Sequence, residues 1–114
     1  MQVYYLEIVT EDVDATCKGL SALHRVEFSL PEPALGGARL AKLADGGQVG
    51  VRAPLAEHDT PIVRPYLRVE DLNAAITTAE KAGAQILMRA TEVPDHGRFA
   101  LYTLGGHQYG LWQV

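Results

Sequence analysis

The sequence predicts an α+β protein built from two similar halves, each with the element order β-α-β-β-β. One observation is an internal repeat at an offset of about sixty residues, which aligns Gly37, Gly46, Gln48 and Gly50 with Gly97, Gly106, Gln108 and Gly110. A second is that a Glu-Asp pair starts the predicted helix of each half, at residues 11–12 and 70–71. Each half is too small to bury a core alone, so we expect one pseudo-symmetric, mostly antiparallel mixed sheet that curves around a cleft, with the helices outside.

The first half follows from residue types in chain order. Strands are predicted where β-branched and aromatic residues gather, and the helix where apolar residues recur at helical spacing after Thr10, a good N-cap. A Gly-Gly turn at residues 46–47 predicts a tight hairpin. The predicted elements are a strand at Val3–Val9, a helix ending near His24, a strand at 26–30, and a hairpin of strands at 39–44 and Gln48–Arg52.

The second half repeats this order after a polar, proline-containing joint at residues 54–61. Gly83 is predicted to close its helix, and Pro65 favours an edge position or a bulge in its first strand. The predicted elements are a strand at 62–69, a helix at 70–82, a strand at 84–88, a loop at 89–97, and strands at 98–104 and 108–114. We expect a single domain over residues 1–114, with modules of about 1–57 and 58–114.

Composition excludes several classes of function. The 114 residues carry a net charge of −4 with acidic and basic side chains interspersed, which argues against a nucleic-acid partner. No apolar run approaches the roughly 18 residues of a membrane span. The single cysteine, Cys17, is predicted to be a small buried hydrophobic residue, and the lack of a leader pattern favours a reduced, cytoplasmic protein.

Three stretches resemble the vicinal oxygen chelate superfamily, which includes glyoxalase I, bleomycin-resistance proteins and extradiol dioxygenases. Residues 6–13 and 65–72 are similar to the family's transitions from strand to helix, and residues 97–113 are similar to its last hairpin. The resemblance covers nearly the whole chain and implies the paired-module fold and a homodimer. It is less informative about activity, because one fold hosts many chemistries.

Family members with metal chemistry carry His, Glu or Gln on the first and last strand of each module. The positions of this chain that match those places are Tyr5, Gly50, Arg64 and Gly110. None is an ordinary metal ligand, since glycine has no donor side chain and arginine repels a cation. A two-residue shift would present Glu7, Gln48, Tyr66 and Gln108 instead. That set lacks an imidazole and is poor for a transition metal, so we predict no metal and no cofactor.

Strand alternation instead predicts a ligand-binding face rich in aromatic rings, amides and guanidinium groups. Its candidate residues are Tyr5, Glu7, Gln48, Arg52, Arg64, Tyr66, Gln108 and Trp112. Such a face suits a planar organic molecule with an acidic or carbonyl group. Gly50 and Gly110 are expected to let that molecule approach the sheet backbone closely.

Three functions are open from the sequence. The first is a metal-free small-molecule-binding protein of the glyoxalase or bleomycin-resistance type. The second is a lyase or dioxygenase-like enzyme, with non-standard metal ligands or with Glu7 as a general base. The third is a non-catalytic dimerisation module, so whether the chain is an enzyme stays open at this point.

Overall fold

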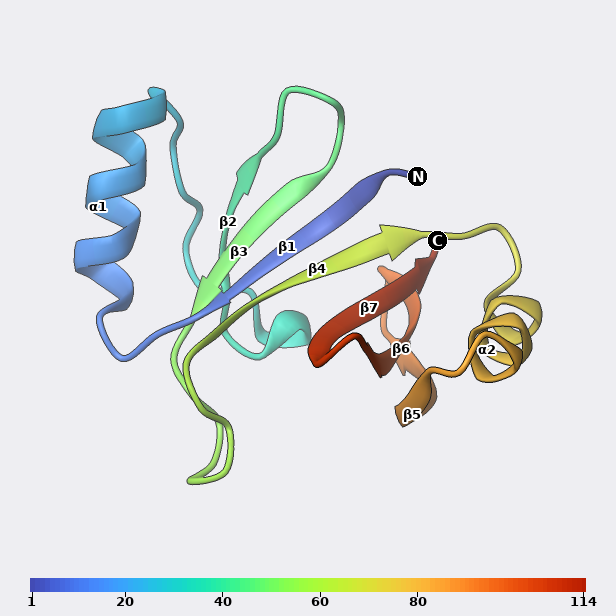
Figure 1. Cartoon of the computed structure of the whole chain (residues 1–114). Coiled ribbons are helices and arrows are strands. Elements are labelled where there is room, and N and C mark those ends of the chain that lie inside the picture. Colours follow the sequence, from blue (N-terminus) through green and yellow to red (C-terminus); the bar gives the residue numbers. More distant parts are fainter. The chain divides into compact units, whose positions relative to one another are not determined.

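The computed structural model describes residues 1–114 and has two compact units (Figure 1). The N-terminal unit is Tyr5–Val63, and the C-terminal unit is Arg64–Val114 together with Met1–Tyr4. The elements are β1 (Val3–Val9), α1 (Val13–His24), a 3₁₀ turn (Pro33–Leu35), β2 (Arg39–Lys42), β3 (Gln48–Arg52), β4 (Ile62–Arg68), α2 (Leu72–Lys81), β5 (Gln85–Val93), β6 (Gly97–Leu104) and β7 (His107–Gln113). The predicted α+β class is confirmed, and neither helix is long and apolar enough to cross a membrane.

In the N-terminal unit the strand order is β2-β3-β1. Strand β1 pairs in parallel with β3, with Tyr5 opposite Gln48, and β2 pairs antiparallel with β3. Helix α1 packs against β3, and an ion pair of 3.0 Å joins Asp14 of α1 to Arg39 of β2. Cys17 of α1 is buried, as predicted, and burial raises the pKa of its thiol above the ordinary value.

The strand predicted at residues 26–30 is not formed, and this prediction was wrong. Only Ser29 reaches β2: its backbone N–H donates to the Leu40 carbonyl at 2.8 Å. The remaining ladder positions there are taken by side chains. The Leu40 N–H donates to the Ser29 hydroxyl, and Arg39 Nε donates to the Ser29 carbonyl, each at 3.0 Å. Such side-chain bonds compete with sheet pairing, so the segment stays irregular.

In the C-terminal unit the strand order is β4-β7-β6-β5. Strands β4 and β7 are parallel, with Tyr66 opposite Gly110, and the other two pairings are antiparallel. The core lies where α2 packs on β6 and β7 (Figure 1), and its buried members are Leu72, Ile76, Ala100 and Leu111. Strand β5 continues to Val93 through most of the predicted loop, with register shifts along the way.

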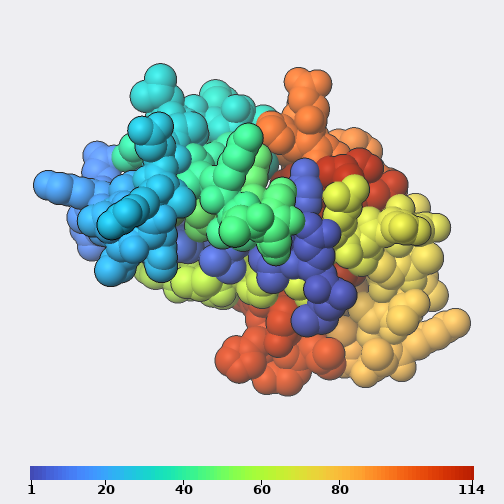
Figure 2. Space-filling model, turned by 90° about the horizontal axis from the view of Figure 1, so that it is seen from above, coloured from blue at the N-terminus to red at the C-terminus, as the bar shows by residue number.

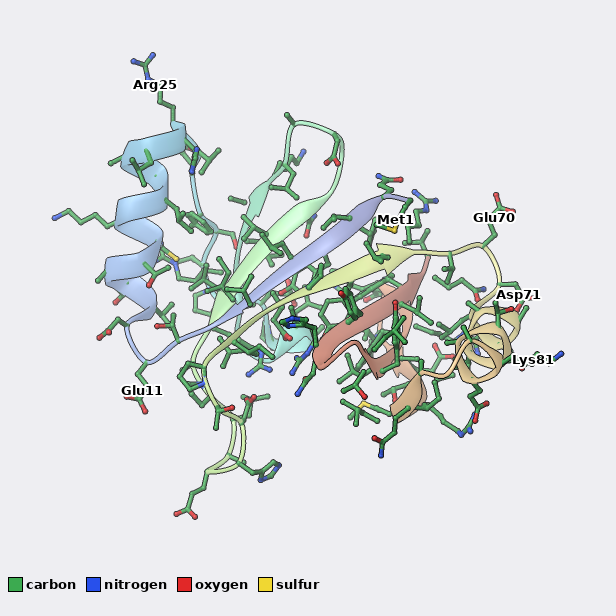
Figure 3. All side chains as sticks on the ribbon, viewed as in Figure 1. Met1, Glu11, Arg25, Glu70, Asp71 and Lys81 are labelled. Carbon is green, nitrogen blue, oxygen red and sulfur yellow. The ribbon has the colours of Figure 1, made fainter.

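The two helices begin differently, and the difference predicts a stability effect. Asp71 starts α2, and its carboxylate accepts a hydrogen bond from the Ala74 N–H at 3.0 Å (Figure 3). Asp12 starts α1 without such a bond; instead its N–H donates to the Thr10 hydroxyl, so the predicted cap at Thr10 was wrong. We expect Asp71→Ala to lower the free energy of unfolding by about 1 kcal/mol, and Asp12→Ala to change it far less. Urea denaturation checks this, and equal losses would contradict it.

Candidate functional site

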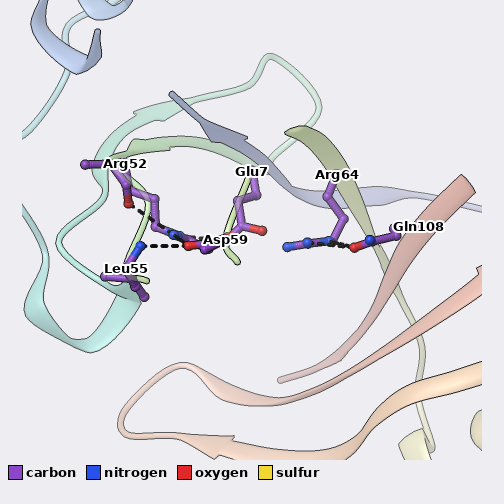
Figure 4. A network of polar contacts seen from close by, with 7 residues as sticks. Glu7, Arg52, Leu55, Asp59, Arg64 and Gln108 are labelled. Atoms are coloured by element: carbon purple, nitrogen blue, oxygen red, sulfur yellow. Dashed lines mark hydrogen bonds and ion pairs between the residues drawn. The ribbon is translucent and has the colours of Figure 1, made fainter. Parts of the chain in front are cut away.

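The N-terminal unit contains a buried ionic network centred on Arg52 of β3 (Figure 4). The guanidinium Nε donates to Glu7 Oε2 at 3.0 Å, and Nη1 donates to Asp59 Oδ2 at 2.7 Å. Asp59 also accepts the Leu55 N–H at 2.8 Å, which fixes the loop after β3. Glu7 and Arg52 expose only 6% and 8% of their surface. The network therefore joins two strands and a loop below the surface of the unit.

Charge compensation explains how this network tolerates burial. Burial by itself lowers the pKa of Arg52, but the hydrogen bonds and charges of Asp59 and Glu7 outweigh it, and the pKa lies above its usual value. The guanidinium therefore stays charged at every physiological pH. Glu7 and Arg52 were predicted ligand-binding residues, and the structure brings them together. Asp59 was not among the predicted residues, because its loop position carries no pattern that links it to a strand residue.

Tyr5 lies across Gly50 on the same unit. Glu7 of β1 is opposite Gly50 of β3 in their parallel pairing. Tyr5 is two residues before Glu7 on β1, so its side chain is on the same face of the sheet. A Cβ at Gly50 would collide with the end of the Tyr5 side chain. The glycine therefore makes room for a tyrosine of the protein itself. The expectation that Gly50 leaves the backbone open to a ligand was wrong.

The C-terminal unit repeats this arrangement with other side chains. A Cβ at Gly110 would collide with the ring of Tyr66, so this glycine too is covered by a tyrosine and the same expectation was wrong. Arg64 is buried, and its Nη2 and Nε donate to the Gln108 side-chain carbonyl at 2.7 and 3.1 Å (Figure 4). Two further predicted site residues, Arg64 and Gln108, are thus direct partners.

The last two predicted site residues of this unit, Tyr66 and Trp112, form an aromatic cluster with Phe99. The ring of Tyr66 lies edge-on to Trp112 at 5.5 Å between centroids, and Phe99 stacks on Trp112 at 5.9 Å. The indole N–H of Trp112 donates to the His96 carbonyl at 2.8 Å. The cluster is packed and hydrogen-bonded within the unit, and it anchors the turn between β5 and β6.

A pocket of about 600 Å³ lies in the N-terminal unit, beside the irregular segment and β2. In the space-filling view, the segment (cyan) and the hairpin between β2 and β3 (green) lie near each other on the surface (Figure 2). The lining residues are Val26, Glu27, Phe28, Ser29, Leu40, Ala41, Lys42 and Gln48. Gln48 is the predicted site residue among them. Sequence reasoning missed Lys42, although it lies opposite Gln48 in the β2–β3 pairing and so shares its face of the sheet.

The residues at the positions that resemble the family's ligand positions are not ordinary ligands of a divalent metal ion. The positions that resemble the family's ligand positions hold Tyr5 and Gly50 in one unit, and Arg64 and Gly110 in the other. Neither pair offers a carboxylate or imidazole, and Arg64 brings a positive charge. The structure also contains no group of three or more His, Cys, Asp or Glu residues arranged to hold a metal.

The order β-α-β-β-β of the C-terminal unit, and the parallel pairing of its first and last strands, agree with the paired-module architecture that the resemblance to the vicinal oxygen chelate superfamily implied. Comparison with solved structures confirms this fold. A hypothetical protein from Bacillus halodurans has a TM-score of 0.78 at 11% identity, covering 99% of this chain and 94% of its own. Methylmalonyl-CoA epimerase from Mycobacterium tuberculosis has a TM-score of 0.75 at 18% identity, covering 96% and 85%.

The chain is also similar in sequence to a curated protein of two mycobacteria. The chain is 29% identical over 116 aligned residues to the protein named "Putative glyoxylase CFP32" in Mycobacterium bovis and Mycobacterium tuberculosis. The match covers 96% of this chain but only 44% of those proteins, so the chain spans less than half the length of the curated relatives it matches. No protein-family model matches the chain. The homodimer implied by the resemblance stays a prediction.

Proposed function

We propose that this chain is a metal-free small-molecule-binding protein of the glyoxalase or bleomycin-resistance type, and that it takes up a planar organic ligand. The observation that carries the proposal is the pocket of about 600 Å³ in the N-terminal unit. That volume is within the range of pockets that enclose small organic molecules. Gln48, one of the residues predicted for ligand binding, lines it.

The pocket lining supports a ligand with one polar group and an apolar body. Val26, Phe28 and Leu40 supply apolar contact area, whereas Lys42 and Gln48 supply hydrogen-bond donors. A mixture of apolar walls and few polar groups is the usual composition of sites for organic molecules. The donor set at the family's metal positions supports binding without an ion.

A thermal-shift screen of planar aromatic acids against the chelator-treated protein tests this proposal. A ligand present at a hundred times its dissociation constant stabilises the folded state by about 2.7 kcal/mol, which corresponds to a rise in Tm on the order of 10 °C for a chain of this size. We expect at least one acid to raise Tm, equally with and without chelator. A panel without any stabilising compound, or a shift that chelation abolishes, would contradict the proposal.

An enzyme that uses Glu7 as a general base is the alternative, and one observation favours it. Glu7 is a buried carboxylate on the first strand, in a fold that methylmalonyl-CoA epimerase also has. Against it, Oε2 of Glu7 already accepts a hydrogen bond from Arg52. A base at this position would catalyse exchange of solvent deuterium into the carbon next to a bound ligand's carbonyl group, and Glu7→Gln would abolish that exchange.

A further inference from the structure

The outer edge of β2 is only partly paired. Both backbone groups of Leu40 face this edge, where they bond Ser29. Alternate residues of a strand direct their N–H and C=O to the same side, so the backbone groups of Lys42 face this edge too. No hydrogen bond joins them to the segment that follows α1. The pocket lies at this unpaired end of the edge.

The register of the missing pairing follows from the one contact that exists. Ser29 lies opposite Leu40, and continuing the antiparallel pairing by two residues places Glu27 opposite Lys42. That pairing would form two backbone hydrogen bonds and a cross-strand pair of opposite charges. In the structure Glu27 and Lys42 are both exposed, and they line the pocket instead of forming an ion pair.

We infer that the pocket binds organic carboxylates at the open edge of β2, and that residues 26–29 are a gate that competes with the ligand. This inference rests on the proposed function and specifies its site and ligand class. The ligand carboxylate takes the place that the register assigns to Glu27, accepting the backbone N–H of Lys42 and pairing with its ammonium group. The apolar body of the ligand lies against Val26, Phe28 and Leu40.

The energetics allow this competition because each closing interaction is weak. An exposed ion pair between Glu27 and Lys42 favours closure by only about two- to fivefold. A ligand that also buries apolar surface in the pocket gains more than the gate loses. Removing the Glu27 charge should therefore favour the open pocket. Removing the Lys42 charge should weaken binding of the ligand directly, because the carboxylate loses its cation.

A two-dimensional ¹H–¹⁵N NMR titration tests the site, with naphthalene-2-carboxylate as probe and uncharged 2-naphthylmethanol as comparator. We expect the acid to shift the amide signals of Lys42 and residues 27–29, and to bind at least about tenfold more tightly than the alcohol. Lys42→Gln should lower the affinity for the acid by about three- to tenfold, and Glu27→Gln should raise that affinity by about two- to fivefold. Lys18→Gln, an exposed change on α1, is the matched control and should have no effect.

A disulfide between Glu27→Cys and Lys42→Cys, in a Cys17→Ala background, tests the gate. Directly opposed, hydrogen-bonded residues of antiparallel strands have Cα atoms about 5.5 Å apart, which suits a disulfide. We expect the oxidised variant to lose binding of the acid, and the reduced variant to bind it about as tightly as Lys42→Gln does, because both lack the Lys42 ammonium group. Equal binding in both forms, or failure of the disulfide to form, would overturn the gate.

The outcomes separate this inference from the proposed function. If the probe shifts only signals of the C-terminal unit, or if Lys42→Gln binds it like the unchanged protein, the inferred carboxylate site at β2 is refuted. The proposed function as a small-molecule-binding protein is then unaffected. If neither the probe nor any acid of the thermal-shift panel binds, both are wrong.

Discussion

Replacing Arg52 by methionine is expected to lower the free energy of unfolding by about 3–5 kcal/mol. The change removes the guanidinium that compensates two carboxylates, those of Glu7 and Asp59, and Glu7 is almost completely buried. Removing one partner of a buried ionic network costs far more than the network contributes when intact, because charge is left in a low-dielectric interior. Urea denaturation followed by circular dichroism measures the loss.

Two controls make this prediction specific to the buried network. Arg89→Met breaks an ion pair with Glu80 in which both side chains are well exposed, and it should cost less than about 1 kcal/mol. Combining Arg52→Met with Glu7→Gln should recover part of the loss, because the neutral amide no longer needs a cation. Equal losses for Arg52→Met and Arg89→Met would show that the network does not contribute as a buried unit.

Replacing Gly110 by alanine is expected to cost about 1–3 kcal/mol. The added Cβ would collide with the ring of Tyr66, which is buried and held by edge-on contacts with Phe99 and Trp112. The ring has no space to move away, so the strand or the aromatic cluster must be distorted. Thermal or urea unfolding monitored by tryptophan fluorescence checks this value.

Gly19→Ala is the matched control, because no atom lies within 4 Å of the Cβ that it adds. In the middle of α1 this change should stabilise the protein by about 0.5–1 kcal/mol, the opposite sign. Adding Tyr66→Ala to Gly110→Ala should show a favourable coupling between the two positions. If the two substitutions show no such coupling, a collision between the alanine and the Tyr66 ring is not the cause of the lost stability.

The internal repeat predicted the main equivalence between the two units. Aligning the halves matched Gln48 with Gln108 and Gly50 with Gly110. In the structure Glu7 is opposite Gly50 and Tyr66 is opposite Gly110, which is the same register in both parallel pairs. Glycine positions and strand alternation can predict this equivalence from the sequence, because turn geometry and side-chain direction depend on residues that are close in the chain.

The features that the sequence did not predict depend on contacts between distant residues. Residues 26–30 have the composition of a strand, but the hydroxyl of Ser29 and the guanidinium of Arg39 take its ladder positions. Asp59 completes the ionic network from a loop that no residue pattern links to Glu7. This irregular segment and β2 line the pocket, so the prediction of a paired strand at residues 26–30 concealed it.

Isothermal titration calorimetry of the chelator-stripped protein with a planar aromatic acid measures whether the pocket binds a ligand without a metal ion. We expect one bound molecule per chain, with a dissociation constant that neither chelator nor added cobalt or zinc changes. Binding that appears only after a metal ion is restored would contradict it.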